Sequence, residues 1–484
     1  MVFSSHLFVF YFLPVALLLY YSLPHRGKHL ALTLLSYLFY GWANPIFVVL
    51  MLASTAVDYV CGLVIARRLT DWRSPMPALT VGGERQRSQK LAVALSVCSN
   101  LALLGFFKYF NFTVDSYNHV LAAVGFEAGQ WDTVLRVTLP LGISFYTFQS
   151  MSYTIDVYRG HARAMRQPID FACYVSMFPQ LVAGPIIRFQ EVADQLRHRV
   201  HTSEKFARGV ALLCVGMAKK VMLANPCGKV ADTVFNAAEV TTVDAWYGSF
   251  AYAMQIYFDF SAYSDMAIGL GLMLGFVFPK NFDSPYKCDS ITDFWRRWHI
   301  SLSTWLRDYL YVPLGGNRGG ASRTYVNLML VMVLGGLWHG ASWNFVIWGT
   351  IHGGWLALER MQGKDSAYRH LPRPLRVAVT FLIVMLAWVF FRADDLPAAL
   401  AHLAAMFALS TPGEAAGLIG GAIYDPFHAL TVTLAGVVVW TAPQSWDWTR
   451  RLSWIKIVIC LLLLWSALAM LEAQAYNPFI YFIF

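Results

Sequence analysis

Apolar runs about as long as a bilayer is thick recur from one end of the chain to the other. A helix of about 20 mostly apolar residues crosses the hydrocarbon core of a membrane. The clear candidates for such spans are Leu7–Leu23, Ile46–Ala66, Leu91–Phe107, Val134–Tyr153, Val326–Leu337 continuing into Ala341–Leu358, Arg376–Phe391, Ala429–Trp440 and Ile455–Leu471. Only 13% of the 484 residues are charged, about half the share of an ordinary soluble domain. The sequence therefore predicts a polytopic membrane protein.

Other apolar stretches are interrupted by polar residues, glycine or proline. They are Leu30–Tyr40, Phe171–Ile187, Gly209–Leu223, Tyr247–Phe278 and Leu396–Leu409. Broken helices at membrane depth are stable only where protein or a water-filled cavity surrounds them. We therefore expect an all-α, integral membrane helical bundle of roughly eleven spans, with re-entrant and interfacial helices and an internal cavity.

Basic residues gather in four clusters between the apolar runs, beginning near Arg67, Arg159, Arg296 and Arg360. Because basic loops stay on the cytoplasmic side of a membrane, this pattern predicts a multi-pass protein with both termini on the outer side. The chain carries 37 Lys and Arg against 28 Asp and Glu, a net charge of +9. The same rule accounts for this excess, so we expect no nucleic-acid partner.

Several enzyme signatures are missing from the sequence: it contains no GxSxG elbow, no GxxxxGK loop and no HExxH motif. The seven cysteines are scattered without a CxxC pair. We therefore expect neither a disulfide framework nor a metal site.

One histidine stands between two long apolar runs, in the segment Gly335-Gly-Leu-Trp-His339-Gly-Ala-Ser-Trp-Asn344. A helical path from Val326 to His339 climbs roughly 20 Å, which places His339 deep in the bilayer. An ionisable residue at that depth is by default a functional candidate. The alternative is a neutral histidine that is hydrogen-bonded between helices.

A second histidine, His299, lies in a segment rich in tryptophan and arginine. Ser290 and Asp293 have capping-box spacing. This spacing predicts a helix that runs past residue 299, and one side of it carries Trp295, His299, Leu302 and Leu306. The nearby arginines would attract the phosphates of a cytosolic cofactor. The alternative is an interfacial helix, with tryptophan at the headgroups and arginine on anionic lipid.

Acidic residues in an apolar run favour a different class of protein. Asp259 and Asp265 belong to a polar band that must face a cavity or pair internally. Such a band is the best sequence argument for a secondary transporter, and structural pairing is the alternative. A third class is a scaffold subunit of a polymer-secretion complex.

Two histidines without a metal cluster favour general-base acyl transfer. A buried neutral imidazole is a good base at neutral pH. It can take the proton of an acceptor hydroxyl as that oxygen attacks a thioester such as acyl-CoA. A base at mid-membrane would join a cytosolic donor to an extracellular hydroxyl.

Four longer matches, in order along the chain, carry a family resemblance. They are Pro140-Leu-Gly-Ile-Ser-Phe-Tyr-Thr-Phe-Gln149, Phe178-Pro-Gln-Leu-Val-Ala-Gly-Pro185, Phe294-Trp-Arg-Arg-Trp-His-Ile-Ser-Leu-Ser-Thr-Trp-Leu-Arg-Asp-Tyr309 followed by Gly336-Leu-Trp-His-Gly-Ala341, and Asn477-Pro-Phe-Ile-Tyr-Phe482. With them the chain resembles the membrane-bound O-acyltransferase superfamily, and within it the branch of alginate O-acetylation membrane subunits. The similarity covers residues 1–484, which implies a single domain.

The resemblance implies a bundle around a central funnel with a thin floor, and it places the family's invariant histidine at His339 and its second histidine at His299. It implies an acetyl-CoA-dependent acetyltransferase of the bacterial inner membrane, without a metal. Periplasmic partners with a serine hydrolase-like domain would pass the acetyl group to an exopolysaccharide, alginate. Related subunits that acetylate cellulose or peptidoglycan, and the D-alanyl transferase of teichoic acids, share the motifs and leave those polymers as alternatives.

These observations and the resemblance together assign expected roles. His339 is expected to act as the base, and His299 is expected to position the donor thioester or the acceptor. The residues expected to line the route between them are Trp298, Arg307, Trp338 and Asn344.

Overall fold

The computed structural model describes residues 1–42, 44–67, 78–126, 131, 136–363, 366–474 and 476–480. These residues are helical or irregular, and none of them is in a strand. The expected all-α fold class is therefore confirmed. The chain divides into two compact units, unit 1 (Met1–Phe206 with Gly271–Phe278) and unit 2 (Ala207–Leu270 with Pro279–Phe484). The expectation of a single domain over residues 1–484 stays a prediction.

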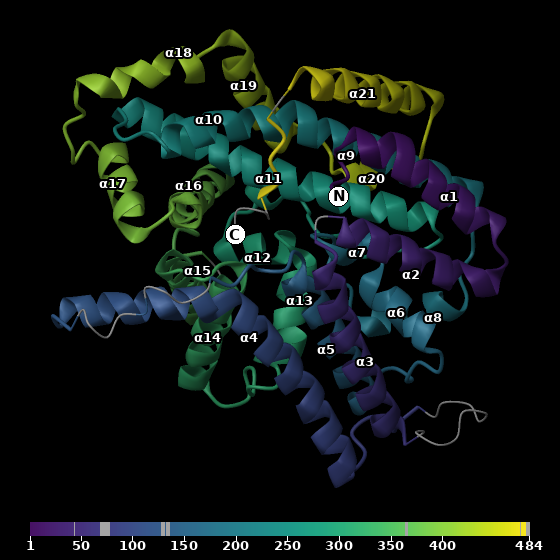
Figure 1. The fold of residues 1–484 in the computed structure, drawn as a ribbon. Helices are drawn as coiled ribbons and strands as arrows, with labels where there is room; N and C mark the ends of the chain where they lie inside the picture. Colours follow the sequence, from purple (N-terminus) through teal and green to yellow (C-terminus); the bar gives the residue numbers. More distant parts are fainter. Residues whose placement is uncertain are drawn as a thin grey trace. The chain divides into compact units, whose positions relative to one another are not determined.

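Unit 1 contains the helices of the N-terminal part of the chain. They are η1 (Leu7–Phe12), α1 (Leu13–Ser22), α2 (His25–Gly41), α3 (Ile46–Ala66), α4 (Arg87–Ala123), α5 (Ile143–Arg159), α6 (Pro168–Ser176), α7 (Phe178–Leu181), α8 (Phe189–Arg197) and the start of α9 (Ser203–Ala218). Helices α3, α4 and α5 pack against one another (Figure 1). The buried carboxylate of Asp58 on α3 accepts hydrogen bonds from Ser96 and Asn100 of α4, at 2.6 and 2.8 Å, and so ties these two helices together.

Unit 2 contains the rest of α9 and all later helices. They are η3 (Lys219–Ala224), α10 (Asn225–Phe235), α11 (Thr242–Met273), η4 (Pro285–Lys287), α12 (Ile291–Arg297), α13 (Ile300–Leu306), η5 (Arg307–Tyr311), α14 (Ala321–His339), α15 (Trp343–Met361), α16 (Arg373–Arg392), α17 (Leu396–Met406), η6 (Glu414–Ile419), α18 (Gly420–Ile423), α19 (Pro426–Thr441), α20 (Ser445–Trp448) and α21 (Trp454–Ala473). Helices α14 and α15 lie side by side (Figure 1). Glycines allow this contact, because a methyl group at Gly336 or Gly349 would overlap the carbonyl oxygen of Phe345 or Met332.

Fewer of the described helices than expected meet the length and apolarity of a membrane span. Among the described residues, four helices are long and apolar enough to cross a membrane: α3, α4, α16 and α21. A fifth results if η6, α18 and α19, which bend by 76°, are counted as one broken span. The expected count of roughly eleven spans is thus not confirmed. Several other helices are too short, or carry too many polar residues, to meet the criteria for a span on their own.

Helix positions match the expected apolar runs closely at α3, α16, α19 and α21. The run expected to be helical from Val134 to Tyr153 differs. Helix α5 begins only at Ile143, because Gly142 before it has a left-handed backbone with φ +74°. Residues 134 and 135 lie outside the described part of the chain.

Candidate functional site

His299 lies at a break between two short helices. Helix α12 ends at Arg297 and α13 begins at Ile300, and His299 between them has φ +43° and ψ +54°. The single helix predicted to run past residue 299 is therefore wrong, although Ser290 caps α12 as expected, accepting from the Asp293 amide at 3.0 Å. The left-handed region is uncommon for a residue other than glycine. Such a conformation persists where the surrounding structure enforces it.

Hydrogen bonds to Asn281 hold His299 in this backbone conformation. Its carbonyl oxygen Oδ1 lies 3.3 Å from Nδ1 of His299 and accepts from the amide and the hydroxyl of Ser301 at 3.2 and 2.9 Å. Its main-chain oxygen accepts from the Ile300 amide at 2.9 Å, while its Nδ2 donates to Ser264. Because Oδ1 only accepts, Nδ1 of His299 carries the ring proton. The other ring nitrogen, Nε2, is thereby left as the basic one.

The free nitrogen of His299 is fully buried. The side chain is 0% exposed, and Nε2 has no hydrogen-bond partner among the described residues. Burial, followed by the nearby His339, holds the pKa of His299 well below its usual range. The imidazole is therefore neutral at physiological pH and is able to accept a proton or a hydrogen bond.

His339 is the last residue of α14 and lies within an aromatic cage. Its ring centroid is 5.0 Å from that of Trp338, 5.4 Å from Trp348 and 5.2 Å from Phe391. The two histidine rings lie 6.4 Å apart. Residues 40 positions apart in the sequence thus meet among aromatic side chains.

A small cavity opens beside His339. Its lining comes from α11, α12, α14, α16 and the C-terminal segment, and consists of Ile256, Phe260, Trp298, His339, Trp388, Phe391 and Ile480. Its volume is about 10 Å³, which accommodates about one water molecule. Side chains in this wall must move before an acyl group can reach His339.

The comparisons with known proteins identify the family of the chain. The sequence model of the membrane-bound O-acyltransferase family matches residues 147–392, a segment that includes both histidines. The chain belongs to this family. It is 51% identical to a probable alginate O-acetylase, AlgI, of Azotobacter vinelandii, over 84% of this chain and 78% of that protein. The protein of the same name from Pseudomonas putida is 44% identical over the whole length of both chains. A peptidoglycan O-acetyltransferase of Helicobacter pylori is 36% identical over 85% of this chain and 80% of its own.

Only some of the expected site residues of this membrane-bound O-acyltransferase lie near His299 and His339. Trp298 lines the cavity beside His339, and the Trp338 ring lies 6.1 Å from His299. Arg307 lies apart from them, with its side chain 59% exposed and paired with Asp308 at 2.7 Å. Asn344 lies at the start of α15, is buried, and donates a hydrogen bond to the main-chain oxygen of Ala393 at 2.8 Å.

A groove next to the site is lined by two arginines of the Trp- and Arg-rich segment and by one arginine of α15. It has a volume of about 510 Å³ and runs between α12, α13, α14 and α15. Arg296, Arg307 and Arg360 line it, together with the Trp295 ring. Trp295 contacts the Trp348 ring at 5.7 Å, and Trp348 contacts His339. Trp295 and Trp348 therefore form a chain of ring contacts from the groove to His339.

Sequence analysis did not identify the residues that position this site. Asn281 lies in a loop without a motif. Glu359 is a fully buried carboxylate on α15 that accepts from the amides of Ile291 and Thr292, both at 2.7 Å, and so fixes the start of α12. The sequence did contain a signal for Glu359, because it is an acidic residue at the end of an apolar run. A buried carboxylate requires hydrogen-bond donors, so such a residue is expected to bind a neighbouring segment.

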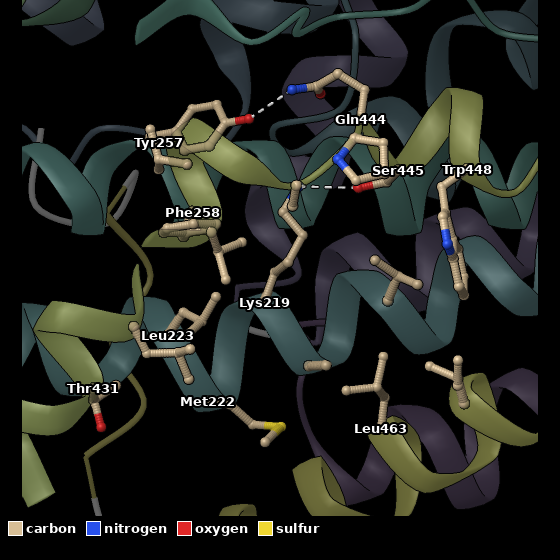
Figure 2. Close-up of a pocket in the computed structure, with 18 of the residues that line it drawn as sticks. Lys219, Met222, Leu223, Tyr257, Phe258, Thr431, Gln444, Ser445, Trp448 and Leu463 are labelled. Atoms are coloured by element: carbon tan, nitrogen blue, oxygen red, sulfur yellow. Dashed lines mark hydrogen bonds between the residues drawn. The ribbon is translucent and has the colours of Figure 1, made fainter. Parts of the chain in front are cut away.

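The two acids of the polar band, Asp259 and Asp265, are paired with neighbouring lysines of η3. Lys219 lies 2.8 Å from Asp265, and Lys220 lies 2.9 Å from Asp259. Figure 2 shows Lys219 beside Ser445 at the polar end of a cavity of about 430 Å³, whose walls are otherwise mostly apolar. The pairing agrees with the structural interpretation of the acidic band.

The Lys220–Asp259 pair also holds the C-terminal segment. The Asp259 carboxylate accepts from the Ile480 amide at 3.0 Å, and Lys220 donates to the main-chain oxygen of Pro478. Ile480 is thereby fixed as part of the wall beside His339. The residues of the terminal motif beyond 480 lie outside the described part of the chain.

Proposed function

We propose that this membrane O-acyltransferase acetylates alginate. It takes the acetyl group from acetyl-CoA at the cytoplasmic face of the bacterial inner membrane, with both of its own termini on the periplasmic side. Periplasmic proteins with a serine hydrolase-like domain receive the group and pass it to the polysaccharide. The observation that carries the proposal is the pair of buried histidines, whose rings lie 6.4 Å apart beside an aromatic-walled cavity that His339 lines, and the alginate O-acetylases among its relatives support the choice of polymer.

His339 acts as the general base. As the acceptor oxygen attacks the thioester carbonyl, a ring nitrogen of His339 takes the hydroxyl proton and later returns it to the departing thiolate sulfur. The new C–O bond replaces the C–S bond, so charge and protons balance. His299 contributes the free Nε2 as a hydrogen-bond acceptor that orients a bound hydroxyl. The tryptophan walls exclude water, which would otherwise hydrolyse the thioester.

The groove along α12 to α15 receives the donor. Arg296, Arg307 and Arg360 supply positive charge for the phosphates of acetyl-CoA. The thioester then reaches His339 by displacing the side chains of Trp295 and Trp348, whose ring contacts lead from the groove to His339.

Complementation tests the proposal in an alginate-producing strain that lacks its own membrane O-acetylase. Acetyl esters on the secreted polymer are measured by NMR for the wild type, His339→Ala and His402→Ala at equal protein level. His402 is a matched control, because it is as buried as His339 (7% against 8% exposed) but packs elsewhere, against Phe235. The wild type and His402→Ala should restore mannuronate acetylation, and His339→Ala should not. Esters on peptidoglycan or cellulose instead of alginate would contradict the choice of polymer.

A further inference from the structure

A groove on unit 2, distinct from the histidine site, combines apolar walls with two cations. It runs along α16 and has a volume of about 710 Å³, and its walls include Val377, Phe381 and Met385 of α16 and Trp440 of α19. Lys287 of η4 and Arg373, the first residue of α16, also line it. Its size and apolar character are typical of a small-ligand site.

Both cations line the groove, and an ion pair joins the segments that carry them. Asp289, two residues after Lys287, pairs at 3.0 Å with Arg376, one helical turn after Arg373. No Asp or Glu lines the groove. Among the described residues neither Lys287 nor Arg373 is in an ion pair, and the Lys287 ammonium donates only to the main-chain oxygen of Ala442, at 3.0 Å. No acidic side chain that lines the groove therefore compensates these two positive charges.

The groove has the length of a lipid chain. From Arg373 to Met385 the helix rises roughly 18 Å, and one leaflet of the hydrocarbon core is about 15 Å thick. Helix α16 is long and apolar enough to cross a membrane, and Leu375 and Leu382 remain exposed on it. The groove thus opens where acyl chains would surround the protein.

We propose that this groove binds an anionic phospholipid of the membrane. Its phosphate contacts Lys287 and Arg373, and one acyl chain lies along Phe381 and Met385 against Trp440. Basic pockets between membrane helices are suited to anionic headgroups. A zwitterionic lipid would also bring an ammonium group close to Lys287 and Arg373, and its headgroup would therefore be attracted less strongly.

The lipid would pack on the aromatic core behind the histidine site. The Phe381 ring lies 5.0 Å from Tyr286, and Tyr286 stacks on Trp298 with centroids 6.1 Å apart. Trp298 lines the cavity of His339. Lipid binding can be measured without acetyl transfer, so its result is independent of the proposed reaction.

Native mass spectrometry of the delipidated full chain tests the proposal, by titration with phosphatidylglycerol or phosphatidylcholine of the same acyl chains. The wild type should bind one phosphatidylglycerol in preference to phosphatidylcholine. Arg373→Gln should weaken phosphatidylglycerol binding about 5-fold, and Lys287→Gln with Arg373→Gln about 30-fold. Arg373→Lys should retain binding. Arg450→Gln, which removes an exposed cation outside the groove, should leave binding unchanged.

A second variant tests the apolar part of the groove. Ala378→Trp places a large side chain in the groove while both cations remain, and it should abolish binding of both lipids. Equal affinity for the two lipids would overturn the proposal. So would unchanged phosphatidylglycerol binding in Arg373→Gln, a single variant that removes no hydrogen bond or ion pair of the described residues.

Discussion

The chemistry of the site depends on a residue that does not contact the proposed acyl group. Asn281 accepts hydrogen bonds from Ile300 and Ser301, which follow the helix break, and its side-chain oxygen faces Nδ1 of His299. The Asn281 side chain thus stabilises the left-handed backbone of His299 and determines which nitrogen of its ring carries the proton. The free Nε2 that faces the core is a consequence of this arrangement.

Replacing Asn281 with alanine should therefore reduce acetyl transfer more than it reduces folding. Without Oδ1, His299 loses its fixed tautomer and the Ser301 amide loses its acceptor. We expect kcat to fall about 10- to 100-fold, measured as CoA release by the purified protein. Asn327→Ala is the matched control: Asn327 is equally buried in unit 2 and donates to Gly316. A similar loss of kcat in both variants would indicate a general packing defect.

At the scale of helices, two contacts shape unit 2: the glycine-mediated packing of α14 on α15, and the ion pairs between η3 and α11. The first positions His339, because α14 ends at this residue. The second holds Ile480 against the same cavity. Both contacts lead to predictions about stability.

Gly349→Ala should destabilise the protein, because the added methyl group overlaps the main-chain oxygen of Met332. We expect a cost of about 1–3 kcal/mol from overpacking. Gly354→Ala, on the same helix, meets nothing within 4 Å and should be neutral or stabilising by up to about 1 kcal/mol. Thermal unfolding in detergent compares the two variants. Equal melting temperatures would contradict the close contact between α14 and α15.

The stability of the protein should depend on Lys220 and Asp259 as a pair and not on either charge alone. Removing one partner leaves a buried charge, which typically costs about 3–5 kcal/mol. Lys220→Met and Asp259→Leu should each lower the melting temperature, and the double variant should recover much of the loss. A double-mutant cycle measures this coupling. Additive losses would favour an independent role for Asp259, as in the transporter hypothesis.

For the whole molecule, composition predicted the all-helical membrane class, because a chain with so few charges cannot cover a water-facing surface. The two histidines were found because one interrupts an apolar run and both stand in family motifs. The helix break at His299 was not predictable from local spacing, since a distant loop residue, Asn281, overrides helix propensity there. The lysine partners of Asp259 and Asp265 were missed for a similar reason. They lie about 40 residues earlier in the chain, on a different helix.

The central claim is that His339 performs acyl transfer. The most direct measurement is release of CoA from radiolabelled acetyl-CoA by the purified protein, with and without a periplasmic fraction that supplies the acceptor, for the wild type, His339→Ala and His402→Ala. We predict acceptor-dependent release by the wild type and His402→Ala, and a decrease of about 100-fold or more in His339→Ala. Release that is unchanged in folded His339→Ala, or absent in the folded wild type with acceptor present, would contradict it.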